Sequence, residues 1–280
     1  MELIIGEHAG FCYGVRRAVE EASRCAKEQV RCATLGPLMH NPQEVARLQA
    51  AGIRMVHAPE EAQPGETLLI RSHGVSPEVL HKAEALGIPV IDLTCPHVSH
   101  IHRLVRDAEP DRTLIILGEA DHPEVQGIAG WSRAPVVILH DARQAETAPL
   151  PERAMVVAQT TIRRETFEAA LEVLRRRIPD LIVHRTVCAA TAQRQKEAEK
   201  LAMEADVVIV VGGRNSANTR KLAQTCQALC PRTLLAETAE EIPKDFIHPE
   251  DKVALTAGAS TPQWLLQAVC DRVRKLAGEL

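Results

Sequence analysis

The feature that most constrains the fold is an order of elements that occurs three times along the chain. Each occurrence has a short apolar run, then a cysteine, then a segment with apolar residues at the i, i+3, i+4, i+7 spacing of a helix with one buried face. The runs and their cysteines are residues 3–5 with Cys12, residues 89–93 with Cys95, and residues 181–183 with Cys188. This recurrence predicts a chain built from three similar structural units.

Three more short apolar runs follow each of these helices. They are residues 33–35, 53–56 and 68–70, then 114–117, 136–139 and 155–157, then 207–211, 234–235 and 253–255. Runs that do not alternate with polar residues, and that helical segments separate, are typical of parallel strands covered on both faces. We therefore predict an α/β fold of three small parallel-sheet domains with four strands each. The predicted boundaries are 1–94, 95–187 and 188–280.

Polar residues collect in the loops that leave the second and fourth strand of each unit. In a parallel sheet these loops lie at the carboxyl ends of the strands, where α/β proteins bind ligands. The candidates are His40, His73, His122, Thr160, Ser216, Asn218 and Ser260. Hydrogen-bond donors at loops leading into helices suit an anion. Glu124, two residues after His122, is a candidate proton carrier, although it is equally suited to the first turn of a helix.

Three cysteines at equivalent points of three similar units would converge if the units pack around a pseudo-threefold axis. A helix N-terminus favours the thiolate, which is the metal-binding form, and three soft ligands suit an iron-sulfur cluster or zinc. Three ligands rather than four indicate a [3Fe-4S] centre or a [4Fe-4S] cluster with one open iron. The remaining five of the eight cysteines have no such recurrence and are assigned to packing: Cys25, Cys32, Cys226, Cys230 and Cys270.

Composition excludes several classes of function. The net charge of -4 and an aromatic content of 2% argue against nucleic acid as a partner. No apolar run approaches the roughly 18 residues that a membrane span requires, and the N-terminus lacks the pattern of an export signal. We therefore expect a cytoplasmic protein without membrane association, whose cysteines stay reduced. The phosphate-binding patterns G-x-x-x-x-G-K-[ST] and G-x-G-x-x-G are absent from the sequence.

Eight short motifs, in one order, resemble those of the 4-hydroxy-3-methylbut-2-enyl diphosphate reductases, the LytB or IspH family, over nearly the whole chain. The motifs are Gly10-Phe11-Cys12-Tyr13-Gly14-Val15, His40-Asn41, Ser72-His73-Gly74-Val75, Thr94-Cys95-Pro96, His122-Pro123-Glu124, Gln159-Thr160-Thr161, Asn215-Ser216-Ala217-Asn218 and Thr256-Ala257-Gly258-Ala259-Ser260. Ala217 stands where many family members have serine, so only its backbone N–H is available there.

This resemblance implies three α/β domains in a trefoil around a [4Fe-4S] cluster held by Cys12, Cys95 and Cys188. It implies reductive dehydroxylation of a small allylic diphosphate to isopentenyl and dimethylallyl diphosphates, the last step of the non-mevalonate isoprenoid pathway, with ferredoxin or flavodoxin as electron donor. Glu124 and Thr160 would relay protons. The implied substrate-binding residues are His40, His73, His122, Thr160, Asn215, Ser216, Ala217, Asn218 and Ser260.

Two alternatives remain open at the level of sequence. A cluster-dependent hydro-lyase would use the same open iron to remove water without net uptake of electrons. A non-catalytic iron-sulfur redox sensor would use the cluster only to switch binding to a partner, and it would not need the polar loops.

Overall fold

The structure of the protein is a computed structural model that describes residues 1–278. These residues form two compact units. Unit 1 contains Met1–Arg16, Met39–Arg47 and the chain from Ala189 onward, and unit 2 contains Arg17–Leu38 and Leu48–Cys188. Helices α1 (Tyr13–Lys27) and α2 (Pro42–Ala50) each contribute residues to both units.

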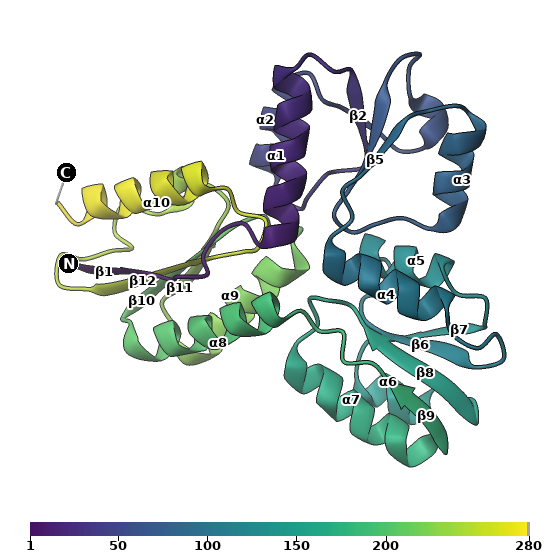
Figure 1. The fold of residues 1–280 in the computed structure, drawn as a ribbon. Coiled ribbons are helices and arrows are strands. Elements are labelled where there is room, and N and C mark those ends of the chain that lie inside the picture. Colours follow the sequence, from purple (N-terminus) through teal and green to yellow (C-terminus); the bar gives the residue numbers. More distant parts are fainter. Residues whose placement is uncertain (279–280) are drawn as a thin grey trace. The chain divides into compact units, whose positions relative to one another are not determined.

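Unit 1 is built on one four-stranded parallel sheet with the strand order β1-β12-β10-β11. The strands are β1 (Glu2–Ile5), β10 (Val207–Val211), β11 (Thr233–Ala236) and β12 (Lys252–Ala257). The helices of this unit are α8 (Ala189–Glu204), α9 (Ala217–Leu229), the short 3-10 helix η2 (Ala239–Glu241) and α10 (Gln263–Leu276). Helix α10 covers one face of the sheet, and α8 and α9 cover the other (Figure 1).

Unit 2 contains two further four-stranded parallel sheets, with the orders β3-β2-β4-β5 and β7-β6-β8-β9. The strands of the first are β2 (Cys32–Leu35), β3 (Arg54–Val56), β4 (Thr67–Ile70) and β5 (Val90–Asp92). The strands of the second are β6 (Thr113–Leu117), β7 (Val136–Leu139), β8 (Arg153–Ala158) and β9 (Asp180–Val183). The remaining helices are η1 (Pro59–Glu61), α3 (Pro77–Ala85), α4 (Pro96–Arg106), α5 (Pro123–Gly130), α6 (Ala142–Thr147) and α7 (Arg164–Arg177).

The strands are apolar throughout because both faces of each sheet are covered. In β10 every residue is buried, and its side chains alternate between two cores, one under α10 and the other under α8 and α9. Strands β6 and β8 likewise divide their side chains between the cluster under α7 and the cluster under α4 and α5. The α/β class with three parallel sheets is therefore confirmed.

In each repeat, the strand before the cysteine and the strands after it belong to different sheets. Strand β1 pairs with β12, almost the full length of the chain away, as Figure 1 shows at the purple and yellow ends of the colour scale. In the same way β5 pairs with β4, and β9 pairs with β8. The expectation that residues 3–5, 89–93 and 181–183 share a sheet with the runs that follow their cysteines is therefore wrong. The domain boundaries at residues 94 and 187 stay predictions.

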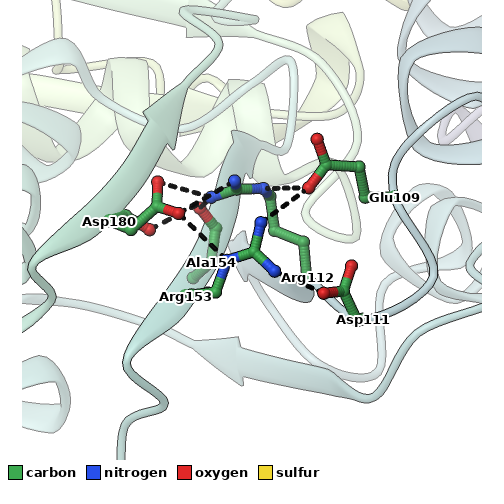
Figure 2. A network of polar contacts seen from close by, with 6 residues as sticks. All are labelled: Glu109, Asp111, Arg112, Arg153, Ala154 and Asp180. Atoms are coloured by element: carbon green, nitrogen blue, oxygen red, sulfur yellow. Dashed lines mark hydrogen bonds and ion pairs between the residues drawn. The ribbon is translucent and has the colours of Figure 1, made fainter.

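The amino ends of β6, β8 and β9 are tied together by a polar network (Figure 2). The buried Arg112 donates to both carboxylate oxygens of Asp180, at 2.8 and 3.0 Å, and Arg153 donates to the same carboxylate at 3.0 Å. Arg112 and then Arg153 lower the pKa of Asp180 to about 2. This network therefore lies at the amino ends of the strands, and the loops at their carboxyl ends lie at the opposite end of the sheet. Within residues 1–278, no helix combines the length and apolarity needed to cross a membrane.

Candidate functional site

In each sheet the carboxyl ends of the two central strands are the place where the topology of the sheet predicts a ligand site. The central pairs are β2 with β4, β6 with β8, and β10 with β12. In the β2/β4 and β6/β8 pairs the chain leaves one strand toward one edge of the sheet and the other strand toward the opposite edge. In the third pair β10 is followed by α9 on one face of the sheet, and β12, the last strand, by α10 on the other face. Such a topological switch point is where open α/β sheets bind their ligands. We call these places the crevices of the β2/β4, β6/β8 and β10/β12 pairs.

A glycine follows the first central strand of every sheet, and the three glycines are held in the same way. Each donates its N–H to the carbonyl at the end of the adjacent edge strand. The bonds are Gly36 to Val56 (2.7 Å), Gly118 to Leu139 (2.9 Å) and Gly212 to Ala236 (3.0 Å). A Cβ on Gly118 would lie 2.8 Å from the Cβ of Gln159, across the crevice. The absence of a side chain therefore lets the two loops of the crevice approach each other.

The three recurring cysteines have equivalent backbone positions. Each donates its N–H to a carbonyl in the loop that follows a central strand, two residues past the end of that strand. The strands are β12, β4 and β8. These bonds are Cys12 to Ala259, Cys95 to Ser72 and Cys188 to Thr160, all of 3.0 Å. Cys12 and its partner lie in unit 1, and the other two pairs lie in unit 2.

Solvent exposure separates these three cysteines from the other five. Cys12, Cys95 and Cys188 are partly exposed cysteines outside any disulfide, while the remaining five are buried. Burial raises the pKa of the Cys32 and Cys226 thiols to about 12 and also raises that of Cys270. Because thiolates are the ligands of soft metals, buried thiols of this kind are unsuited to binding them. Accessibility and equivalent placement make the first three suitable as a ligand set.

The crevice of the β6/β8 pair brings Glu124 and Thr160 into direct contact. The Glu124 carboxylate accepts the Thr160 backbone N–H at 2.5 Å and the Thr160 hydroxyl at 2.8 Å. Glu124 is only 2% exposed and lies in the first turn of α5. Gln159 closes the same crevice, because its side-chain oxygen accepts the Glu119 N–H at 3.0 Å. A carboxylate paired to a hydroxyl in a buried crevice is suited to hold and transfer a proton.

His122 and His73 lie together in unit 2. His122 caps α5, and its Nδ1 accepts the Glu124 N–H at 3.1 Å. In the neutral ring this bond leaves the proton on Nε2, so that atom becomes a donor. The His73 ring meets the His122 ring edge-on, with 5.4 Å between centroids. The two predicted ligand-binding histidines of this unit therefore lie next to each other.

The crevice of the β10/β12 pair lies in unit 1 and holds the neutral donors. The Ser260 hydroxyl donates to the His40 carbonyl at 3.1 Å, and Ser216 caps α9 by accepting the Thr219 N–H at 3.3 Å. Asn218 is 3% exposed, and neither atom of its side-chain amide has a hydrogen-bonding partner within residues 1–278. A buried amide of this kind costs free energy unless a ligand or water satisfies it.

Two neighbours of these residues differ in what they offer. Asn215 is exposed just before α9. Ala217 is the first residue of α9 and is buried, so it contributes only backbone groups to a ligand.

Sequence reasoning assigned no role to two residues that shape the loops. Gln159 lies in a recognised motif, but its bridge across the crevice depends on the pairing of β6 with β8. Asn41 is 1% exposed, and its side-chain oxygen accepts the Glu44 N–H at 2.8 Å at the start of α2. The spacing of Asn41 and Glu44 is that of a helix-capping pair, so this signal was available in the sequence.

Comparisons with known proteins find similar chains that cover nearly the whole length of this chain. The family model described as "LytB protein" matches residues 3–274. A 4-hydroxy-3-methylbut-2-enyl diphosphate reductase of Caldanaerobacter subterraneus subsp. tengcongensis is 38% identical over 284 residues, covering 100% of this chain and 99% of the relative. Its counterpart in Geobacter sulfurreducens is 40% identical over 279 residues, covering 98% of each chain.

Two solved structures are also similar. One is an (E)-4-hydroxy-3-methyl-but-2-enyl diphosphate reductase described as the terminal enzyme of the non-mevalonate pathway, with a TM-score of 0.74 and 40% identity over 98% of this chain and 100% of the other. The second is the E-1-hydroxy-2-methyl-but-2-enyl-4-diphosphate reductase of Plasmodium falciparum, with a TM-score of 0.89 and 25% identity over 98% of this chain and 88% of the other.

Proposed function

Because the chain belongs to the LytB family, we propose that it reduces 4-hydroxy-3-methylbut-2-enyl diphosphate to isopentenyl and dimethylallyl diphosphates. The reaction takes up two electrons and two protons, breaks the carbon–oxygen bond of the hydroxyl group, and releases one water. The observation that carries the proposal is the family match over residues 3–274, together with 38–40% identity to reductases over the whole chain.

Membership of the family implies an iron-sulfur cofactor. We infer that Cys12, Cys95 and Cys188 together hold a [4Fe-4S] cluster. The matched backbone bonds of the three cysteines and their partial exposure support this ligand set. When bound, a cluster with three protein ligands supplies electrons and an open iron that acts as a Lewis acid toward the hydroxyl.

The neutral donors of the crevices would bind the diphosphate. Asn218 supports this role most directly, because its buried amide has no partner within residues 1–278. The proposed set is His40, His73, His122, Thr160, Asn215, Ser216, the Ala217 backbone N–H, Asn218 and Ser260. Binding the diphosphate at many points orients the distant hydroxyl and excludes water from it.

Glu124 would hold the proton that converts the hydroxyl group into departing water. The 2.8 Å hydrogen bond from the Thr160 hydroxyl gives this proton a path between the two side chains. Ferredoxin or flavodoxin would deliver the electrons singly.

The test is turnover by protein reconstituted anaerobically with iron and sulfide. Given a one-electron reductant and the hydroxymethyl-butenyl diphosphate, it should release both five-carbon diphosphates and consume two electrons per product. Dehydration without reductant would indicate a hydro-lyase instead. An intact cluster with no product would overturn the proposed reaction.

A matched pair of variants tests the ligand set. Cys95→Ala should lower the iron content and bleach the visible absorption of the cluster, since one of three ligands is lost. Cys270→Ala, at a buried cysteine of α10 that packs into the core of unit 1, should keep both. Equal iron content in the two variants would contradict the assignment.

A further inference from the structure

Arg71 is a cation that its own surroundings do not neutralise. It is the first residue after β4 and lies two residues before His73. Its side chain is partly buried, and its Nε is fully buried without a hydrogen-bonding partner among residues 1–278. No hydrogen bond or ion pair of this guanidinium occurs within the described chain, and burial lowers the pKa of Arg71. Burying a charge without a partner is unfavourable.

The guanidinium lies over the crevice of the β2/β4 pair. Gly36 follows β2 and adopts a φ of +69°, and a Cβ there would lie 2.6 Å from Nη1 of Arg71. Only glycine both accepts this backbone conformation readily and leaves room for the arginine. The loop after β2 and the loop after β4 therefore enclose the guanidinium at the point where a parallel sheet binds its ligand.

The equivalent position of the neighbouring sheet shows how such a crevice is closed without a ligand. Gln159 is the first residue after β8, as Arg71 is after β4. Its oxygen accepts the Glu119 N–H and its nitrogen donates to the Thr161 hydroxyl, both at 3.0 Å. The neutral amide of Gln159 thus finds its hydrogen-bonding partners within the protein, whereas the donors of Arg71 have none in the described chain. A position that served only to join the two loops would not need a charge.

We propose that Arg71 binds the diphosphate group of the substrate and is the charged residue in an otherwise neutral set of donors. This inference rests on the proposed function and adds to it a specificity-determining residue. A planar guanidinium offers paired donors that match phosphate oxygens. A charged hydrogen bond of this kind contributes about 1.5–3 kcal/mol, or roughly a 10- to 100-fold change in affinity.

The test measures binding of inorganic diphosphate to the cluster-containing protein by calorimetry. Arg71→Gln should weaken binding about 10- to 100-fold, and Arg71→Lys, which keeps the charge but loses the fork, should fall between the two. Arg103→Gln provides a matched control, because Arg103 is an exposed arginine of the same unit on α4. It should bind diphosphate within about twofold of the parent protein, which is within the range of an exposed charge.

Thermal unfolding separates ligand binding from a structural role. If Arg71 serves to bind the anion, Arg71→Gln without ligand should melt no lower than the parent protein, because an uncompensated charge has been removed. The rise in melting temperature that diphosphate induces should be smaller in this variant. A lower melting temperature with an unchanged diphosphate-induced rise would overturn the proposal, as would unchanged affinity.

Turnover distinguishes this inference from the proposed function. Diphosphate binding that depends on Arg71 in a protein without reductase activity would refute the reaction and leave the anion site standing. Normal reduction with an unchanged KM in Arg71→Gln would refute the anion site alone.

Discussion

The crevices of the β6/β8 and β2/β4 pairs have the same backbone arrangement, but they differ in whether their polar side chains have hydrogen-bonding partners. In the first, Gln159 pairs with the facing loop and Glu124 pairs with Thr160. In the second, the guanidinium of Arg71 lies against Gly36 without a partner in the described chain. A repeated fold therefore determines where ligands can bind, while the side chains decide whether a crevice is closed by the protein or depends on a ligand.

The largest expected effect comes from Glu124→Gln, which tests whether the satisfied crevice has a chemical role. The amide keeps the shape but cannot carry a proton, so turnover should fall about 10²- to 10⁴-fold. The iron content should be unchanged. Steady-state rates and the visible absorption of the cluster measure the two quantities.

Asp121→Asn is the matched control, because Asp121 is exposed in the same loop. It should keep nearly full turnover. Full activity in Glu124→Gln would remove Glu124 from the proton path and leave the crevice of the β6/β8 pair a purely structural feature.

Gly118→Ala should disrupt the crevice of the β6/β8 pair, because the new methyl group overlaps with Gln159. The new Cβ would lie 2.8 Å from the Gln159 Cβ, close to the backbone, so the facing loop has to move. We expect a loss of about 3 kcal/mol in the free energy of unfolding, the upper end for overpacking a buried site. Denaturant unfolding measures it.

Gly36→Ala is the corresponding change in the other crevice. There the closest atom is the end of a long side chain, Nη1 of Arg71 at 2.6 Å, which can move aside. Steric overlap alone should therefore cost less than in Gly118→Ala, although the positive φ adds strain, while diphosphate binding should weaken more. Equal losses of binding in the two variants would show that the crevices do not differ as described.

The buried His102, on α4, should make stability depend on pH. The ring is 6% exposed, stacks on Trp131 at 5.3 Å, and lies where a Cβ on Gly74 would meet it at 2.5 Å. Burial, opposed by Asp92, lowers the pKa of His102 from 6.5 to about 4. Between these pH values the unfolded chain binds the proton and the folded chain does not, so stability falls as the pH falls.

The size of this effect can be measured by denaturant unfolding at pH 7 and pH 5. The contribution of His102 should be about 2 kcal/mol smaller at pH 5 than at pH 7. His102→Gln should lose that part of the pH dependence. An identical pH dependence in the variant and the parent protein would show that the ring is not held neutral by burial.

The smallest effect is expected from Asp180→Asn, at the edge of the sheet opposite the crevice of the β6/β8 pair (Figure 2). Arg112 keeps its bonds to Glu109 and to the Ala154 carbonyl, so part of its pairing survives. The melting temperature should fall modestly, and the fall should shrink as the pH drops toward 2, where Asp180 begins to be protonated in the parent protein too. Turnover should not change, and a large loss of turnover would mean that this edge is coupled to the crevice.

The sequence predicted the fold class and most of its helices and strands, and it selected most of the candidate site residues. The apolar runs and helical periodicity identified strands such as β10 and helices such as α4, because element type is encoded in local spacing. Recurrence in register separated Cys12, Cys95 and Cys188 from the five cysteines that the structure buries. Glu124 and Thr160 were selected through their motifs, and the structure brings them together.

Only the tertiary structure decided how distant segments pair. It placed β1 beside β12, because an edge strand joins whichever sheet buries its apolar residues, and no local pattern specifies that partner. It also made Gln159 a bridge and left Arg71 without a partner in the part of the chain that the structure describes, although both occupy the same position after a strand. Whether a polar side chain is satisfied depends on the loop across the crevice, and that loop comes from another part of the chain.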